Sequence, residues 1–256
     1  MIGCDFVNFN NKTAISTGAA SGMGLLFAQC FAQLGGNVVM CDIDSEKLKE
    51  LVNEINAQGK GKAIGVQCDV RDYNQVANAV NTAVEEFGSV DVLVNFAGGA
   101  ETRMLNCPDL FPDAPIEVYD WGIDVNLKGQ MYFDHAVMRQ MKKQNSGVII
   151  NIGSITGEEG CGRNLAYSTS KSGVMYGLTK SVALAGAPYG VRCNCISPGP
   201  VLTRPGMSEM TTLMGRAAEP QEIIDMVLFV ASDKCSFMTG ENILIDGGRL
   251  IMRGKN

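Results

Sequence analysis

The amino-acid sequence predicts an α/β fold of the doubly wound type, with about seven parallel strands and helices on both faces of the sheet. Short apolar runs alternate with longer stretches of helical periodicity along all 256 residues. This alternation is typical of βαβ units. The short runs contain few polar residues, as expected for parallel strands buried on both faces. We expect residues 1–256 to form a single domain.

The predicted elements alternate from the first apolar run to the last. Strands are expected at 13–17, 37–41, 63–67, 90–95, 147–152, 191–196 and 242–245. Helices are expected at 23–33, 45–58, 73–87, 116–143, 166–187 and 220–232. The least regular segments, 98–115 and 198–219, follow strand ends, where ligands bind open α/β sheets. We therefore expect both to border a substrate site, with a small lid at about 200–218.

Composition and charge exclude several classes of function. Hydrophobic residues make up 46% of the chain and the net charge is −6, which indicates a globular protein without the basic surface that binds nucleic acid or anionic membranes. No apolar run is long enough to cross a bilayer, and residues 1–11 do not resemble a secretion signal. His135 is the only histidine, so we expect neither a histidine-rich metal site nor a Ser-His-Asp triad. The nine cysteines include no C-x-x-C pair, which predicts buried, reduced thiols in a cytoplasmic protein.

A glycine-rich turn joins the first predicted strand to the first predicted helix. Gly18 allows the chain to turn sharply, and Gly22 and Gly24 allow close approach of a pyrophosphate and of the helix to the strand. The helix N-terminus, from Ser21 to Met23, offers N–H groups to phosphates. Glycine clusters also occur in ordinary turns. Their place between the first strand and the first helix favours a dinucleotide site.

An acidic residue at the end of the second predicted strand favours NAD over NADP. Asp42 stands where a carboxylate meets the adenine ribose hydroxyls, and Ile43 follows it. Its charge repels a 2′-phosphate, and Asp44 adds negative charge. Asp44 and Ser45 also have an ordinary interpretation as helix N-cap residues. We expect NAD as the cofactor.

Tyr167 and Lys171 lie at i and i+4 of a predicted helix and therefore share one face. A free phenol has a pKa of about 10, too high for a base at neutral pH. A nearby ammonium favours the phenolate and lowers that pKa, so Tyr167 becomes a candidate for proton transfer. By spacing alone, such a pair is more often an ordinary surface pair.

Two polar residues change that balance. Ser154 follows a predicted strand, and its hydroxyl is expected to hydrogen-bond the substrate oxygen beside the phenol. Asn126 lies inside the predicted helix 116–143, where asparagine is unfavourable, so a functional role would explain its presence. The alternative for Asn126 is a tolerated polar residue or a local kink.

These residues together closely resemble the short-chain dehydrogenase/reductase family, over nearly the whole chain. The shared marks are 17–24, Asp69, 95–98, Asn126, Ser154, Tyr167, Lys171, Pro198, Gly199, Thr203 and 246–248. No single mark is specific, but their joint occurrence in this order is. The resemblance implies a Rossmann-type fold, usually a homotetramer, that transfers a hydride between NAD(H) and a secondary alcohol or ketone.

The resemblance also implies a role for each matching residue. Ser154 orients and polarises the substrate oxygen, and Tyr167 is the general acid/base. Lys171 lowers the pKa of Tyr167 and binds the nicotinamide ribose, while Asn126 supports a water in a proton relay. The cofactor-binding residues implied are Gly18, Ser21, Gly22, Met23, Gly24, Asp42, Ile43, Asp69, Val70, Asn95, Ala97, Gly98, Tyr167, Lys171, Pro198, Gly199, Val201 and Thr203. Phe96 departs from the family pattern, which has a second asparagine there.

The substrate is the open part of the prediction. Polar residues near the site favour a polyol, sugar or hydroxy acid, although loop charges usually face water: Glu101, Arg103, Asn106, Asp109, Asp113, Glu158, Glu159, Arg163 and Asn164. The apolar residues Met207, Met210, Leu213 and Met214 favour instead a ligand such as a steroid. The alternatives are therefore a hydroxysteroid dehydrogenase, a 3-oxoacyl-carrier reductase, which usually prefers NADPH, or a non-catalytic NAD-binding sensor. The intact catalytic residues weigh against the sensor.

Overall fold

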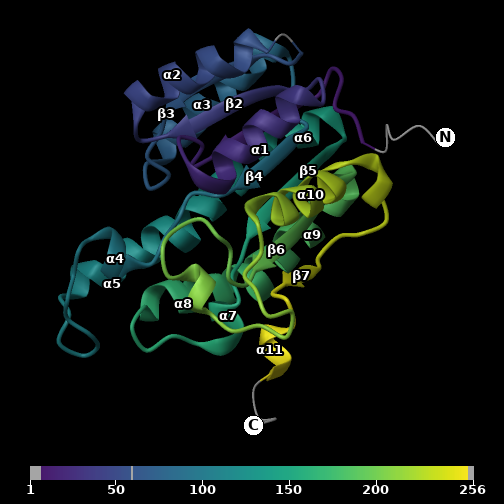
Figure 1. Cartoon of the computed structure of the whole chain (residues 1–256). Helices are drawn as coiled ribbons and strands as arrows, with labels where there is room; N and C mark the ends of the chain where they lie inside the picture. The colour runs from purple at the N-terminus through teal and green to yellow at the C-terminus, as the bar shows by residue number, and fades with distance from the viewer. Residues whose placement is uncertain (1–6, 59, 253–256) are drawn as a thin grey trace.

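The computed structural model describes residues 7–58 and 60–252, and it contains one seven-stranded parallel sheet in the order β3-β2-β1-β4-β5-β6-β7 (Figure 1). The strands are β1 (Thr13–Thr17), β2 (Asn37–Asp42), β3 (Ala63–Gln67), β4 (Val92–Asn95), β5 (Gly147–Ile152), β6 (Val191–Pro198) and β7 (Asn242–Ile245). The sheet confirms the predicted fold class. β4 begins two residues later than expected, and β6 continues to Pro198.

Helices cover both faces of the sheet (Figure 1). The long ones are α1 (Gly22–Gln33), α2 (Ser45–Ala57), α3 (Tyr73–Phe87), α5 (Ile116–Ile123), α6 (Gly129–Gln144), α8 (Leu165–Ser172), α9 (Thr179–Gly186) and α10 (Pro220–Ala231). One apolar core joins the sheet to α1, α2 and α10, and a second joins it to α3, α6 and α9. In the described part of the chain, no helix is long and apolar enough to cross a membrane.

The two longest predicted helices are each interrupted by a π-helical segment. The segment η1 (Asp124–Lys128) separates α5 from α6, and η2 (Gly173–Leu178) separates α8 from α9. Such segments occur mostly as single turns inside α-helices, often at functional sites. The sequence pattern predicted both helices but not their interruptions, because a π segment barely changes the apolar periodicity.

Several short helices were not expected. These are α4 (Glu101–Met104), α7 (Thr156–Glu159), α11 (Arg249–Met252), η3 (Ala187–Tyr189), η4 (Met207–Glu209) and η5 (Asp233–Cys235). Elements of three or four residues are too short to show periodicity in a sequence. The single-domain organisation and the lid at about 200–218 stay predictions.

Candidate active site and cofactor site

The chain reverses its winding direction between β1 and β4, which are neighbours in the centre of the sheet. Thr17 at the end of β1 pairs with Asn95 at the end of β4. In open α/β sheets, ligands bind in the crevice outside the strand ends at such a switch point. The predicted site residues after β1, β2, β4, β5 and β6 therefore share one edge of the sheet.

The glycine turn after β1 has the shape of a phosphate cradle. Gly18 has a φ of 63°, in the left-handed region, and a Cβ there would lie 3.0 Å from the Cα of Ala97. A Cβ on Gly24 would lie 2.5 Å from the carbonyl oxygen of Gly18. Ser21, the N-cap of α1, makes no side-chain cap, which leaves the first-turn N–H groups of α1 to another acceptor. These features fit a dinucleotide's phosphates.

Asp42 joins the end of β2 to the glycine turn. Its carboxylate accepts hydrogen bonds from Ala20 N at 3.0 Å and from Asp44 N at 3.1 Å. Ile43, beside it, is 66% exposed, an unusual position for a large apolar side chain and one that suits an adenine ring. The carboxylate of Asp44 accepts a hydrogen bond from Lys47 N. Asp44 is therefore the N-cap of α2, which was the alternative interpretation of this residue from the sequence.

The other predicted adenine neighbours follow β3. Val70 is buried, and its Cγ2 lies 2.6 Å from where a Cβ on Gly129 would stand. The carboxylate of Asp69 is paired with the guanidinium of Arg71, with the shortest N–O distance at 2.6 Å. This bond to Arg71 lowers the pKa of Asp69. Asp69 therefore follows β3 with its carboxylate already paired to Arg71.

The candidate catalytic side chains converge after β5. Ser154 lies two residues after the end of β5, and its Oγ accepts a hydrogen bond from the Thr156 hydroxyl at 2.9 Å. Tyr167 and Lys171 lie on α8, with Lys171 Nζ 5.5 Å from the centre of the tyrosine ring. Lys171 is 3% exposed and donates to the carbonyl oxygen of Ile152 at 2.6 Å. Serine, phenol and ammonium therefore face one space.

Burial governs the protonation of this pair. It raises the pKa of Tyr167, and the Ser154 hydroxyl together with the charges of Arg204 and Arg103 acts in the opposite direction. Burial also lowers the pKa of Lys171 to about 8. The lowering of the phenol pKa expected from Lys171 is therefore not what this structure shows, because burial dominates and the ammonium is directed at Ile152.

Asn126 lies in η1 and is completely buried. Its side-chain amide donates to the carbonyl oxygens of Gly99 at 3.0 Å and Gly122 at 2.8 Å, and its Oδ1 accepts from Gly99 N at 2.9 Å. The side chain thus clamps the loop after β4, and a Cβ on Gly98 would lie 3.7 Å from Lys171 Nζ. The helix-interior asparagine therefore coincides with both a π segment and the catalytic neighbourhood.

Gln130 connects these groups, although it was not among the predicted site residues. Its side-chain amide donates to the backbone oxygens of Asn126 and Ile152, both at 3.1 Å. Its Oε1 accepts from Ile152 N at 3.2 Å. Because Lys171 donates to the same Ile152 oxygen, Gln130 helps to set the position of the ammonium. A buried glutamine in a helix pattern was the available signal.

Glu101 does not lie where the sequence analysis expected it. We expected it in a polar substrate wall, but it is fully buried and caps the N-terminus of α8. Its two carboxylate oxygens accept from Ala166 N at 2.8 Å and Tyr167 N at 3.1 Å. A carboxylate at a helix N-terminus is stabilised by the free N–H groups and the helix dipole. Glu101 therefore fixes the backbone of the candidate catalytic tyrosine.

Asn95 lies below the site rather than on its surface. Its amide donates to Asp134 Oδ1 at 2.8 Å and to Asn151 Oδ1 at 2.9 Å, and Asn151 in turn donates to Asp134 Oδ2 at 3.1 Å. All three side chains are buried. Burial raises the pKa of Asp134 to about 7. The side chain of Asn95 therefore ties β4 to β5 and α6.

The remaining predicted residues lie at the ends of β4 and β6. Ala97 N donates to the Thr17 hydroxyl at 2.9 Å. The carbonyl oxygen of Pro198 accepts from Ile155 N at 2.9 Å, which ties β6 to the loop of Ser154. Phe96, the departure from the family pattern, packs against Phe27 of α1 in a tilted arrangement, with ring centroids 5.8 Å apart. Its aromatic ring is thus accommodated by the core under α1.

The last three predicted cofactor neighbours follow Pro198. Gly199 N donates to the carbonyl oxygen of Ile245 at 2.8 Å. Val201 is buried and forms a bridge with Ala218, and Thr203 N donates to the Val201 oxygen at 2.7 Å. The segment therefore leaves the sheet in a defined turn, with the side chain of Thr203 exposed.

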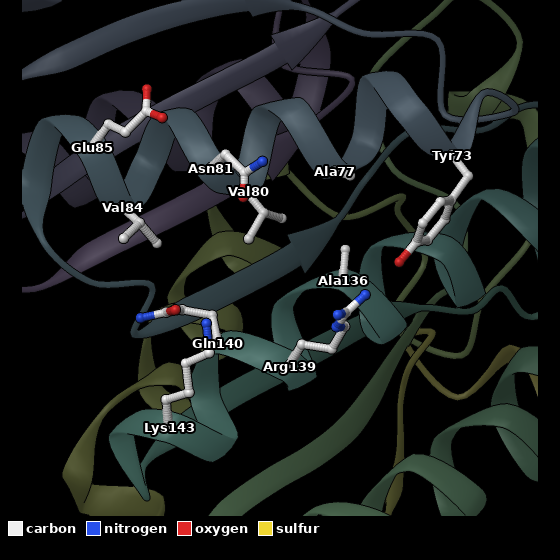
Figure 2. A pocket seen from close by; sticks show the side chains of 10 residues that line it. All are labelled: Tyr73, Ala77, Val80, Asn81, Val84, Glu85, Ala136, Arg139, Gln140 and Lys143. Atoms are coloured by element: carbon white, nitrogen blue, oxygen red, sulfur yellow. The ribbon is translucent and has the colours of Figure 1, made fainter.

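A separate hollow of about 390 Å³ lies between α3 and α6. Figure 2 shows Val80 and Val84 of α3 facing Arg139 and Gln140 of α6 across it. The lining includes Tyr73 but none of the predicted site residues. This hollow is therefore distinct from the strand-end site.

Comparisons with known proteins agree with this geometry. The family model described as enoyl-(acyl carrier protein) reductase matches residues 18–249. Trans-4-hydroxycyclohexanecarboxylate dehydrogenase of Sinomonas cyclohexanicum is 40% identical, covering 93% of this chain and 92% of the relative. L-rhamnose 1-dehydrogenase (NAD(P)(+)) of Azotobacter vinelandii is 36% identical, covering 94% and 97%. The 3-oxoacyl-[acyl-carrier-protein] reductase of Thermotoga maritima is also 36% identical, covering 96% and 100%.

A solved structure supports the same assignment. A short-chain type dehydrogenase/reductase from Mycobacterium ulcerans matches with a TM-score of 0.88 at 26% identity, covering 96% of this chain and 92% of that one. The sheet order, the strand-end site and the relatives lead to one conclusion. The chain is an oxidoreductase of the short-chain dehydrogenase/reductase family.

Proposed function

We propose that this protein transfers a hydride between NAD(H) and a secondary alcohol or ketone. The observation that carries the proposal is the convergence of Ser154, Tyr167 and Lys171 on the sheet edge that also bears the glycine turn. When bound, the nicotinamide supplies the hydride acceptor or donor. In oxidation, the carbon-bound hydrogen leaves as hydride and the hydroxyl proton passes to the protein.

Tyr167 is the general acid/base in this proposal. It takes the hydroxyl proton during oxidation and returns it during reduction. Ser154 holds the substrate oxygen beside the phenol, a role supported by its interaction with Tyr167. Lys171 binds the nicotinamide ribose, and Asn126 keeps the neighbouring loop in place and supports a water in the proton relay. The clamp of Asn126 on Gly99 supports the positioning part of that role.

The choice of NAD rests on Asp42. A carboxylate at the end of β2 repels a 2′-phosphate, and two backbone N–H groups hold it in position. We propose that the other cofactor-binding residues named in the sequence analysis bind NAD. Asn95 contributes indirectly, because its buried side chain holds β4 in place. The names of the relatives cover several substrate classes: one is named for a hydroxy acid, another for L-rhamnose and another for acyl-carrier esters. We favour a polar alcohol over a steroid.

Assembly and location complete the proposal. We propose a homotetramer in the cytoplasm. The tetramer is supported by apolar side chains that stay exposed on the long helices, including Met131 on α6 and Leu184 on α9. Large exposed apolar residues on neighbouring helices are typical of subunit contacts. The segment 200–218 is proposed as the lid, with its exposed Leu213 and Met214 available to a bound substrate.

A panel of secondary alcohols and ketones, assayed with NAD(H) and NADP(H) at the nicotinamide absorbance, tests the function. Turnover with NAD(H) is expected, and Tyr167→Phe should lower kcat by about 10²- to 10⁴-fold while still binding NADH. Tyr189→Phe, which removes a hydroxyl far from the site, should leave kcat unchanged. Undiminished turnover by Tyr167→Phe would refute its role, and a strong NADPH preference would refute the cofactor assignment.

A further inference from the structure

The short helix α4 is attached to the helix that carries the candidate catalytic tyrosine. Glu101 bonds to the backbone N–H groups of Ala166 and Tyr167, and the Thr102 hydroxyl donates to Asn164 Oδ1 at 2.6 Å. Both side chains are buried. Three hydrogen bonds therefore fix the position of α4 relative to Tyr167. They also fix the backbone position of Arg103, the residue that follows Thr102 in α4.

That residue is Arg103, whose guanidinium lies beside Gly99 in the loop after β4. Its Nη2 lies 3.1 Å from the point where a Cβ on Gly99 would stand. The N–H and carbonyl groups of Gly99 are both bonded to Asn126. The guanidinium therefore rests on the same loop that Asn126 holds against the catalytic residues.

A second arginine acts electrostatically on both Arg103 and Tyr167. Arg204 belongs to the segment after β6, which arches between α4–α5 and α8 (Figure 1). Burial, followed by the charge of Arg204, lowers the pKa of Arg103. The two arginine charges also oppose the burial that raises the pKa of Tyr167. Arg103, Arg204 and Tyr167 are thus close enough to interact electrostatically.

Neither guanidinium has a partner within residues 7–58 and 60–252, where ion pairs and hydrogen bonds are described. Among the other arginines, Arg71, Arg216 and Arg249 are each paired with a carboxylate. Glu101 is two residues from Arg103 but is directed into α8, and residues at i and i+2 do not share a helix face. Two unpaired like charges repel one another, and an anion between them removes that repulsion.

We propose that Arg103, together with Arg204, binds an oxyanion on the substrate, a carboxylate or a phosphate, beside Tyr167. This inference rests on the proposed function and narrows its substrate to an anionic alcohol or ketone. A guanidinium matches the two oxygens of such a group with two parallel hydrogen bonds. The anion also orients the rest of the substrate, because α4 is fixed to the helix of the general acid/base.

Equilibrium binding tests the site without requiring turnover. Cyclohexanecarboxylate, cyclohexyl phosphate and the neutral cyclohexanecarboxamide are titrated by calorimetry into the full chain, with and without NADH. We expect the anions to bind and the amide to bind at least about tenfold more weakly, as for loss of a charged hydrogen bond. The tighter of the two anions identifies the oxyanion. Equal affinity for the amide and both anions would overturn the proposal.

Variants locate the binding. Arg103→Gln and Arg204→Gln should each weaken anion binding by about ten- to a hundredfold. Arg139→Gln, which removes an exposed arginine at the hollow between α3 and α6, is the matched control and should bind as the parent does. Thermal unfolding confirms that all three variants fold. Anion affinity that stays unchanged in folded Arg103→Gln and Arg204→Gln would also overturn the proposal.

The proposed function and this inference fail in different ways. Arginine-dependent anion binding without turnover of any alcohol or ketone would reject the oxidoreductase proposal and keep the anion site. Turnover of neutral alcohols, with no preference for anionic ones and no anion binding, would keep the oxidoreductase proposal and reject the anion site.

Discussion

The nucleotide end and the catalytic end of this sheet are built in different ways. At the nucleotide end, the fit comes from local backbone: a glycine turn, a helix N-terminus and a carboxylate one strand away. At the catalytic end, Asn126, Lys171 and Glu101 bond to backbone groups that lie many residues from them in the sequence. Substitutions in the first region should therefore have local, steric effects, whereas the effects of substitutions in the second should reach other helices and strands.

The glycine turn provides the largest expected effect. Gly24→Ala places a Cβ 2.5 Å from the carbonyl oxygen of Gly18, and backbone has to move to admit it. We expect about 1–3 kcal/mol of lost stability, typical of overpacking, and a loss of NADH affinity of about tenfold or more. Fluorescence titration with NADH and urea unfolding measure the two effects.

Gly177→Ala is the matched control for this substitution. Gly177 lies in η2, and a Cβ there would meet nothing within 4 Å. NADH affinity should stay at the parent value in this control. An unaltered NADH affinity in Gly24→Ala would mean that the close approach of helix to turn does not shape the cofactor site.

The buried network beneath the catalytic end predicts a dependence of stability on pH. Burial raises the pKa of Asp134 to about 7, above its unfolded value near 4. The protonated form is thus favoured by folding, and the stability it contributes is fully present below about pH 4 and is lost as the pH rises through about 7. Asp134→Asn removes the ionisable carboxyl group, so this part of the pH dependence of stability should disappear.

Urea unfolding between pH 5 and 8 measures that difference. Over this range the parent should lose on the order of 2 kcal/mol more than Asp134→Asn. Asp113→Asn, at an exposed loop position, should follow the parent. Parallel stability curves for the parent and Asp134→Asn would show that Asp134 stays ionised in the folded protein.

Glu101→Gln tests the long-range character of the catalytic end, with the smallest expected effect. The amide keeps one acceptor for α8 but places an NH₂ against the other N–H group, so kcat should fall about tenfold, as for loss of one charged hydrogen bond. After burial, the charge of Glu101 also raises the pKa of Tyr167. Its removal should shift the pH profile of kcat to lower pH.

Glu117→Gln, at an exposed position in the first turn of α5, is the control for charge alone. Its pH profile should match the parent. If Glu101→Gln lowers thermal stability without moving the pH profile, the carboxylate supports folding only and does not position the tyrosine.

Local patterns predicted what depends on neighbouring residues. The strand and helix periods placed all seven strands, and the turn at Gly18 and Gly24 was visible because its steric requirements lie within a few residues. The Tyr167–Lys171 spacing was equally visible, since i and i+4 share a helix face. The short helix α4 was not visible, because four residues carry no periodic signal.

By itself, then, the sequence determined the parallel α/β fold, the family and the residue types at the strand-end site, because each of these leaves a short-range pattern. Only the tertiary structure decided what those residues touch. It turned Glu101 onto the N-terminus of α8, placed Gln130 between Asn126 and Ile152, and left Arg103 without an ion-pair partner in the described residues, beside Gly99. Such contacts join segments distant in sequence, and the hydrogen-bonding needs of buried groups select them only once the chain is folded.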